Sequence, residues 1–216
     1  MAGHILTLAQ QKGGSGKTTL AAHLAVAFLQ GRKSVAVLDV DPQGSLGEWF
    51  EAREQFLGED DVGLSFRTAS GWGARREARS LARDYDYVVV DTPPKSDLES
   101  RPAIESADLV LVPIQPTPVD LWATEPTLEL VAKEKAAAIL VVNRAVQRAT
   151  LTGEMRAAIG QLGCRVAESS LGSRVAFAAA MGQGRTVTET APSGPAAREV
   201  ADLAAEIRKH LKSLGG

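Results

Sequence analysis

A glycine-rich segment near the start of the chain has the residue types of a phosphate-binding loop. The sequence KGGSGKTT, residues 12–19, lies between an apolar run and a long helical pattern. Glycines let backbone N–H groups approach phosphates closely, and the following helix adds partial positive charge at its N-terminus. In such a loop Lys17 bridges the β- and γ-phosphates of ATP, and the Thr18 hydroxyl is a ligand of Mg²⁺. The predicted phosphate-binding residues are Gly13, Gly14, Ser15, Gly16, Lys17, Thr18 and Thr19.

Aspartates follow two of the apolar runs. VLDVDPQG places Asp39 and Asp41 at the end of one run, and YVVVDTPP places Asp91 at the end of another. A single aspartate in such a place is often only a turn or a helix cap. Ligands of parallel sheets bind at the carboxyl ends of strands, so three aspartates there should converge near Mg²⁺ and the γ-phosphate.

Alternating strand and helix patterns must position these residues. YVVVD, LVLVP and AILVVN are apolar almost throughout, which is typical of strands covered on both faces. The alternation predicts an α/β fold with a doubly wound, mostly parallel sheet flanked by helices, in one domain of residues 1–216. The expected strands are 4–9, 34–39, 63–68, 87–91, 109–113, 138–143 and 164–168; the expected helices are 17–30, 46–56, 73–83, 100–105, 123–135, 152–161, 175–182 and 195–213.

Composition narrows the class of protein. The 216 residues carry a net charge of −2 and one cysteine, which excludes an internal disulfide and a four-cysteine metal site. No apolar stretch approaches the roughly 20 residues of a membrane span, and no signal peptide is visible. These features favour a cytoplasmic location. The last 73 residues carry ten basic and six acidic side chains, which suggests an anionic partner for that part of the chain.

The motifs together resemble those of the ParA/MinD family of ATPases. KGGSGKTT is similar to the family's deviant Walker A motif, DVDPQGS to its second motif, and YDYVVVDTPP to its Walker B motif. PIQPTPVDLWA, LVVNR and a late arginine-containing segment also match. The resemblance spans essentially the whole chain. The length resembles the small ParA subgroup, which includes plasmid-partition ATPases such as ParF and relatives that position carboxysomes or chemotaxis clusters.

The resemblance implies roles for individual residues. Lys12 matches the signature lysine, which reaches across an ATP-bound homodimer to the partner's nucleotide, and Asp41 matches the residue that positions the attacking water. Lys12, Lys17 and Asp41 are therefore the expected catalytic residues. The expected Mg²⁺ group is Thr18, Asp39 and Asp91, and the expected nucleotide contacts beyond the loop are Lys12, Asn143 and Pro192.

The implied activity is slow ATP hydrolysis, stimulated by a partner, that drives a dimerisation switch. The family implies that the ATP dimer binds DNA without sequence preference, associates with the nucleoid, and positions a cargo through a small ParB-like adaptor. A second basic surface, spaced along one helix at Arg75, Arg79 and Arg83, is interpreted as a solvated helix face. The candidate DNA-binding residues are Arg174, Arg144, Arg148, Arg185 and Arg198.

Two other functions fit the same motifs. One is a membrane-associated spatial regulator like MinD, for which the last helix would supply an apolar stripe of Leu203, Ile207, Leu211 and Leu214. We expect this stripe to pack on the core instead, which makes membrane binding the weaker hypothesis. The other is a metabolic ATP-dependent enzyme on the same scaffold. The three tryptophans, Trp49, Trp72 and Trp122, are interpreted as packing residues.

Overall fold

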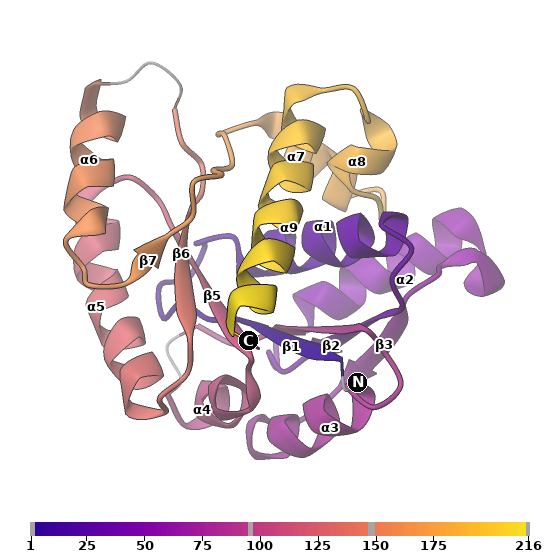
Figure 1. Ribbon diagram of the computed structural model, residues 1–216. Helices are drawn as coiled ribbons and strands as arrows, with labels where there is room; N and C mark the ends of the chain where they lie inside the picture. The colour runs from indigo at the N-terminus through magenta and orange to yellow at the C-terminus, as the bar shows by residue number, and fades with distance from the viewer. Residues whose placement is uncertain (1–2, 95–96, 147–149, 215–216) are drawn as a thin grey trace.

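A computed structural model describes residues 3–94, 97–146 and 150–214 of the chain. Its centre is a parallel sheet whose described strands lie in the order β3-β2-β4-β1-β5-β6-β7 (Figure 1). The predicted α/β fold with a doubly wound parallel sheet is confirmed. The strands are β1 (His4–Leu8), β2 (Val35–Asp39), β3 (Ser65–Thr68), β4 (Tyr87–Asp91), β5 (Leu109–Ile114), β6 (Ala138–Val142) and β7 (Arg165–Val166).

Helices cover both faces of the sheet. One core cluster joins the sheet to α1, α2, α7, α8 and α9, and two others join its opposite face to α3, α4, α5 and α6. The α-helices are α1 (Lys17–Gln30), α2 (Ser45–Leu57), α3 (Ala74–Leu81), α4 (Asp97–Ser106), α5 (Pro118–Lys133), α6 (Thr150–Gly160), α7 (Val175–Met181), α8 (Val187–Thr190) and α9 (Pro195–Leu214). Two short 3₁₀ helices, η1 (Glu59–Asp61) and η2 (Gly71–Gly73), lie beside β3 in sequence.

The side chains of β4 show how the strands are covered on both faces. Tyr87 and Val89 belong to the core beneath α1, whereas Val88 and Val90 belong to the core beneath α3. Successive side chains of a strand point to opposite faces, so a strand buried on both sides must be apolar throughout. The ring of Phe28 in α1 stacks on Tyr87 with 4.3 Å between centroids.

Several boundaries differ from the expected ones. Helix α5 begins five residues earlier than expected, because Thr117 caps it by accepting a hydrogen bond from the Asp120 N–H and Pro118 occupies its first turn. Helix α8 was not expected, although Thr186 and Glu189 form a capping box at its start. The two residues of β7 are fewer than the five expected there.

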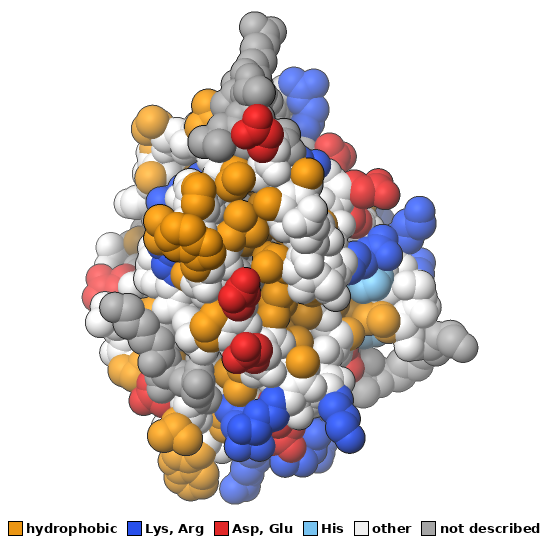
Figure 2. Space-filling model, turned by 90° about the vertical axis from the view of Figure 1, so that its left-hand side faces the viewer, with side chains coloured by type: hydrophobic (Ala, Val, Ile, Leu, Met, Phe, Trp, Pro, Cys, Tyr) orange, Lys and Arg blue, Asp and Glu red, His pale blue; other side chains and the backbone are white. Residues whose placement is uncertain are grey.

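Burial settles the roles of two other groups of apolar residues. Leu203, Ile207 and Leu211 of α9 are buried, so most of the apolar stripe packs on the core as predicted, but Leu214 at its end is 47% exposed. The packing interpretation is confirmed for Trp49, which is buried, but it is wrong for Trp72 and Trp122, which are 85% and 68% exposed. Figure 2, which looks onto the side of the molecule formed by α5 and α6, shows apolar side chains gathered over the upper half of that face. None of the helices in the described ranges is long and apolar enough to cross a membrane.

Candidate nucleotide-binding site

The phosphate loop joins β1 to α1 at the carboxyl end of the sheet. Strand β1 lies between β4 and β5, which places the loop at the point where the chain switches from one half of the sheet to the other. Gly16 has φ +95°, and a Cβ there would lie 2.4 Å from Nδ2 of Asn143. This position therefore needs glycine both for its backbone conformation and for the close approach of Asn143.

Lys17 is held over the loop of its own subunit. Its side chain is buried, and its Nζ donates a hydrogen bond to the carbonyl of Gln10 at 3.0 Å. Burial lowers the pKa of the Lys17 ammonium, and the charges of Asp91 and Asp41 partly offset this effect. A buried ammonium beside the loop amides is the arrangement that neutralises a bound phosphate.

Thr18 and Asp91 are brought together where a magnesium ion would bind. The Thr18 hydroxyl donates to Oδ2 of Asp91 at 2.6 Å. Oδ1 of Asp91 is buried and has no hydrogen-bond partner among the described residues. Burial raises the pKa of Asp91 to about 7, and the Thr18 hydrogen bond opposes that rise. An orphaned carboxylate oxygen beside a hydroxyl fits Mg²⁺, which proteins usually hold with one or two such groups plus substrate phosphates.

Asp39 contributes in a different way. Its Oδ1 accepts the Asp41 N–H at 3.0 Å and its Oδ2 accepts the Gly47 N–H at 3.2 Å. Burial raises the pKa of Asp39. The carboxylate thus fixes the loop between β2 and α2. Within the described ranges no three His, Cys, Asp or Glu side chains converge as a metal site of their own.

Asp41 lies on the same loop and faces the phosphate-binding region. Its Oδ1 accepts the Gln43 N–H at 2.9 Å. It lines a hollow of about 580 Å³ with the phosphate loop, Pro94 and Arg144. The predicted water-positioning residue therefore borders the space above the loop.

Lys12 points away from this hollow. Its Nζ lies 2.6 Å from Oδ2 of Asp120 in α5, which also accepts a hydrogen bond from the Thr117 hydroxyl. Lys12 is 30% exposed and Asp120 is buried. Sequence reasoning did not single out Asp120. The sequence feature that could have indicated Asp120 is the Thr117–Pro118 pair at the start of the helix, because Thr117 lies three residues before Asp120.

A polar network that was also missed supports the start of the loop. Gln10 donates through Nε2 to the Thr124 hydroxyl at 2.9 Å and accepts through Oε1 from Thr127 at 3.1 Å. The Thr127 hydroxyl also accepts the Gln11 N–H. These threonines are buried polar residues three apart in α5, which is the pattern that could have indicated them.

A second hollow of about 310 Å³ adjoins the loop and has the size of a nucleoside site. Residues shared with the first hollow include Gly16, Thr19 and Arg144. Asn143 lines it, but its Nδ2 donates to the Ser15 carbonyl at 2.8 Å and its Oδ1 accepts the Arg144 N–H, so this amide braces the loop. Pro192 is exposed between α8 and α9 and is not among the described residues that line either hollow.

The candidate DNA-binding arginines do not form one uniform group. Arg144 and Arg198 are exposed. Arg174 is paired with Glu199 at 2.6 Å, and Arg185 lies over the Phe56 ring at 4.8 Å. Arg148 lies outside the described residues.

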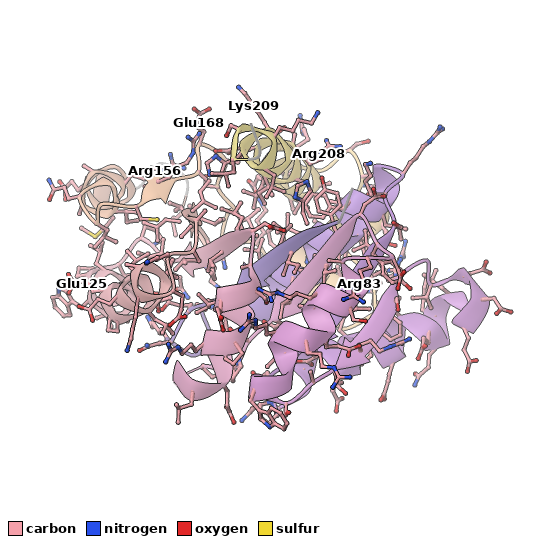
Figure 3. All side chains as sticks on the ribbon, turned by 60° about the horizontal axis from the view of Figure 1, so that its bottom comes forward. Arg83, Glu125, Arg156, Glu168, Arg208 and Lys209 are labelled. Atoms are coloured by element: carbon pink, nitrogen blue, oxygen red, sulfur yellow. The ribbon has the colours of Figure 1, made fainter. Side chains whose placement is uncertain are left out.

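Further basic residues lie near α9. Figure 3 shows Arg156, Arg208 and Lys209 along the side of α6 and α9, with Glu168 among them. Arg83 follows α3, on the opposite face of the sheet. Only a subset of these charges is therefore available to an anionic partner on one side of the molecule.

The fold and loop together define a P-loop nucleotide-binding protein. The family described as the CobQ/CobB/MinD/ParA nucleotide binding domain matches residues 6–187. The chain belongs to this family, as an ATPase of the ParA/MinD type.

Similar proteins cover nearly its whole length. The chain is 30% identical to maintenance of carboxysome distribution protein A of Halothiobacillus neapolitanus over 94% of this chain and 95% of that protein. It is 28% identical to the chromosome-partitioning ATPase Soj of Thermus thermophilus, with 96% of each chain covered. The septum site-determining protein MinD from Pyrococcus horikoshii, solved with Mg-ADP, shares the fold with a TM-score of 0.82, 19% identity and 98% coverage of each chain.

Proposed function

We propose that the protein is an ATP-dependent dimerisation switch that binds DNA without sequence preference and positions a cargo through an adaptor protein. Support comes from full-length similarity to a protein named for carboxysome distribution and to one named for chromosome partitioning. The cargo could be a plasmid, a chromosome region, a carboxysome or a protein cluster. Nucleoid association follows from the proposed DNA binding.

The proposed mechanism of hydrolysis relies on position and charge. Lys17 and the loop amides would hold the phosphates, and Thr18 and Asp91 would hold Mg²⁺, which would supply charge neutralisation for phosphoryl transfer. Asp41 orients the attacking water from the neighbouring loop. Slow, partner-stimulated turnover is expected because phosphoryl transfer needs a complete set of positive charges, and within one subunit Lys12 is paired with Asp120 instead of contributing to its own loop.

The separation of the two lysines is the observation that carries the proposal. Lys17 is buried against Gln10, whereas Lys12 extends to the surface and pairs with Asp120 of α5. In the proposed dimer, Lys12 leaves Asp120 and binds the nucleotide of the other subunit. Hydrolysis and loss of the γ-phosphate then remove the charge that holds Lys12 across the interface.

DNA binding is proposed for the side of the molecule near α9. Arg198 is exposed at the start of this helix, and Arg208 and Lys209 lie near its end (Figure 3). Binding without sequence preference requires clustered positive charge against phosphates and no contact with bases. The ATP dimer would double this basic surface.

The alternative functions have weaker support. A membrane-binding α9 would need a free apolar stripe, yet three of its leucine and isoleucine side chains are buried. A metabolic enzyme of this fold would need a second substrate beside the γ-phosphate, and no observation favours one.

Light scattering with ATP tests the dimer. Wild-type protein should double in mass when ATP replaces ADP, and Lys12→Ala should remain a monomer while still binding ATP. Lys33→Ala, which removes a surface lysine paired with Asp86, is the control and should dimerise normally. If Lys12→Ala dimerised fully in ATP, the result would contradict the proposed dimer. If wild-type protein with ATP did not bind DNA of arbitrary sequence in a gel-shift assay, the proposed DNA binding would be contradicted.

A further inference from the structure

Strand β3 forms an edge of the sheet and has a groove along it. Among the described strands it pairs only with β2, and α2 lies beside it (Figure 1). Two adjoining hollows of about 580 and 410 Å³ run between α2 and β3 and share Gly47, Glu51 and Phe66. We call this continuous groove the β3 trough. It extends from Asp41 at one end to Leu64 at the other.

The trough is strongly acidic. Arg67 is the one basic residue among the described residues that line it, and its guanidinium donates to the neighbouring Phe66 carbonyl at 2.8 Å. Such an excess of negative charge favours a basic partner, both during encounter and in the bound state. The carboxylates along the trough belong to Asp39, Asp41, Glu48, Glu51, Glu54 and Glu99.

Apolar side chains are exposed where η2 meets α4, at one end of the trough. Gly71 of η2 packs so closely on α4 that a Cβ there would lie 2.5 Å from Cα of Glu99. The residues next to this contact, Trp72 and Leu98, are each 85% exposed. Exposed tryptophan is costly in water and is enriched among residues that dominate binding energy in protein interfaces.

We propose that the β3 trough binds an extended basic segment of a partner protein. The segment would add a strand to the free edge of β3, and its alternate side chains would face α2. Lysine or arginine at these positions would pair with Glu51 and Glu54. An apolar side chain of the segment, at the end of the trough where η2 meets α4, would contact Trp72 and Leu98.

The position of the trough connects this binding to hydrolysis. Asp41, the proposed water-positioning residue, lines both the trough and the hollow above the phosphate loop. A bound segment would therefore contact the loop that carries Asp41, and could act as the stimulating part of an adaptor. This last step rests on the proposed function, whereas the binding itself does not.

Peptide binding to the full-length chain without nucleotide tests the proposal. The probe is a fluorescent ten-residue peptide that alternates lysine with threonine and valine, and its counterpart carries glutamate in place of lysine. The lysine peptide should bind and the glutamate peptide should not. Glu51→Lys with Glu54→Lys should weaken binding about 10-fold or more, and Trp72→Ala about 5-fold.

The matched control is Glu125→Lys with Glu129→Lys, which changes the net charge equally on the exposed face of α5, far along the sheet from β3 (Figure 3). It should leave affinity within about two-fold. Bound peptide should also slow amide hydrogen exchange across residues 65–68, because a strand added to β3 protects them.

Three results would overturn the proposal. The first is equal loss of affinity in the α5 control, which would mean attraction by net charge alone. The second is failure of the lysine peptide to bind. The third is a dimer in the absence of peptide that Trp72→Ala dissociates, which would mean that a second copy covers the trough. Because the assay contains no ATP, failure of the proposed switch would not alter its outcome.

Discussion

The phosphate loop and the basic C-terminal segment, residues 144–216, differ in how their charges are held. In the loop, Lys17 donates a hydrogen bond to the Gln10 carbonyl and Thr18 donates one to Asp91, and both acceptors lie at the carboxyl ends of central strands. In the C-terminal segment, Arg174 and Glu199 form an ion pair between residues 25 positions apart, whereas Arg198 is exposed. The polar groups of the loop are therefore positioned to bind phosphate. The C-terminal segment is a mixture of neutralised and available charges.

The comparison shows that arginines which the sequence marks equally as candidate DNA-binding residues are not equally available to an anionic partner. Arg174 is one of the candidate DNA-binding residues, yet Glu199 already neutralises it. Arg185 bonds the Glu189 carbonyl and stacks on Phe56, so it braces α8 against α2. A residue that is already satisfied gains less from a new anionic partner, since it must give up its existing contacts.

The two regions meet at His23. This buried residue of α1 contacts the Phe177 ring of α7 with 5.1 Å between centroids. Its Nδ1 bonds the Thr19 carbonyl at 2.8 Å, and its Nε2 is buried with no partner among the described residues. Because that environment disfavours a charge, burial lowers the pKa of His23 to about 4.

The largest expected effect is at Asp41, beside the phosphate loop. Asp41→Ala should reduce the rate of ATP hydrolysis by about 100-fold, since it removes the group that orients water. ATP affinity should change little, because the loop and Lys17 are untouched. Single-turnover hydrolysis with a parallel measurement of nucleotide affinity checks this. Hydrolysis at the wild-type rate would remove Asp41 from the mechanism.

Acid should loosen the contact between the two regions. The pKa of His23 is lower in the folded state than its ordinary value of 6.5, so the unfolded chain binds more protons between about pH 4 and 6.5. The stability contributed by neutral His23 is therefore present above pH 6.5 and is lost as pH falls towards 4. The free energy of unfolding should drop by about 3 kcal/mol over this range from His23 alone.

Urea unfolding at several pH values measures that drop. His23→Asn should flatten the dependence between pH 4 and 6.5, whereas His4→Asn serves as the control for loss of a histidine from the same half of the chain. Parallel curves for wild type and His23→Asn would show that another group governs the acid sensitivity.

The smallest expected effects distinguish available from neutralised arginines. Arg198→Ala should weaken non-specific DNA binding about 5-fold, and Arg174→Ala less than about two-fold. Glu199→Gln should strengthen binding slightly, since it releases Arg174. Filter binding at two salt concentrations measures these changes. If Arg174→Ala weakened binding more than Arg198→Ala did, the DNA-bound state would have to break the Arg174–Glu199 pair.

Much of the fold and the phosphate site could be predicted from sequence. The apolar runs of β4, β5 and β6 are buried on both faces, and that requirement is visible directly in residue type. The phosphate loop could be predicted because the left-handed backbone at position 16 favours glycine, and because the phosphate-binding lysine, Lys17, directly follows that glycine. The start of α5 was missed because its Pro118 resembles a helix breaker, although a helix tolerates proline in its first turn.

By itself, the sequence determined the α/β fold, the phosphate loop and the grouping of Thr18 with Asp91. These features depend on local backbone requirements and on where the apolar strands end, both of which residue types indicate. The tertiary structure alone decided that Lys12 pairs with Asp120, that Arg174 is neutralised, and that Trp72 stands exposed beside an acidic groove. Such pairings join residues distant in sequence, and their energies depend on separation and burial, which only the folded chain defines.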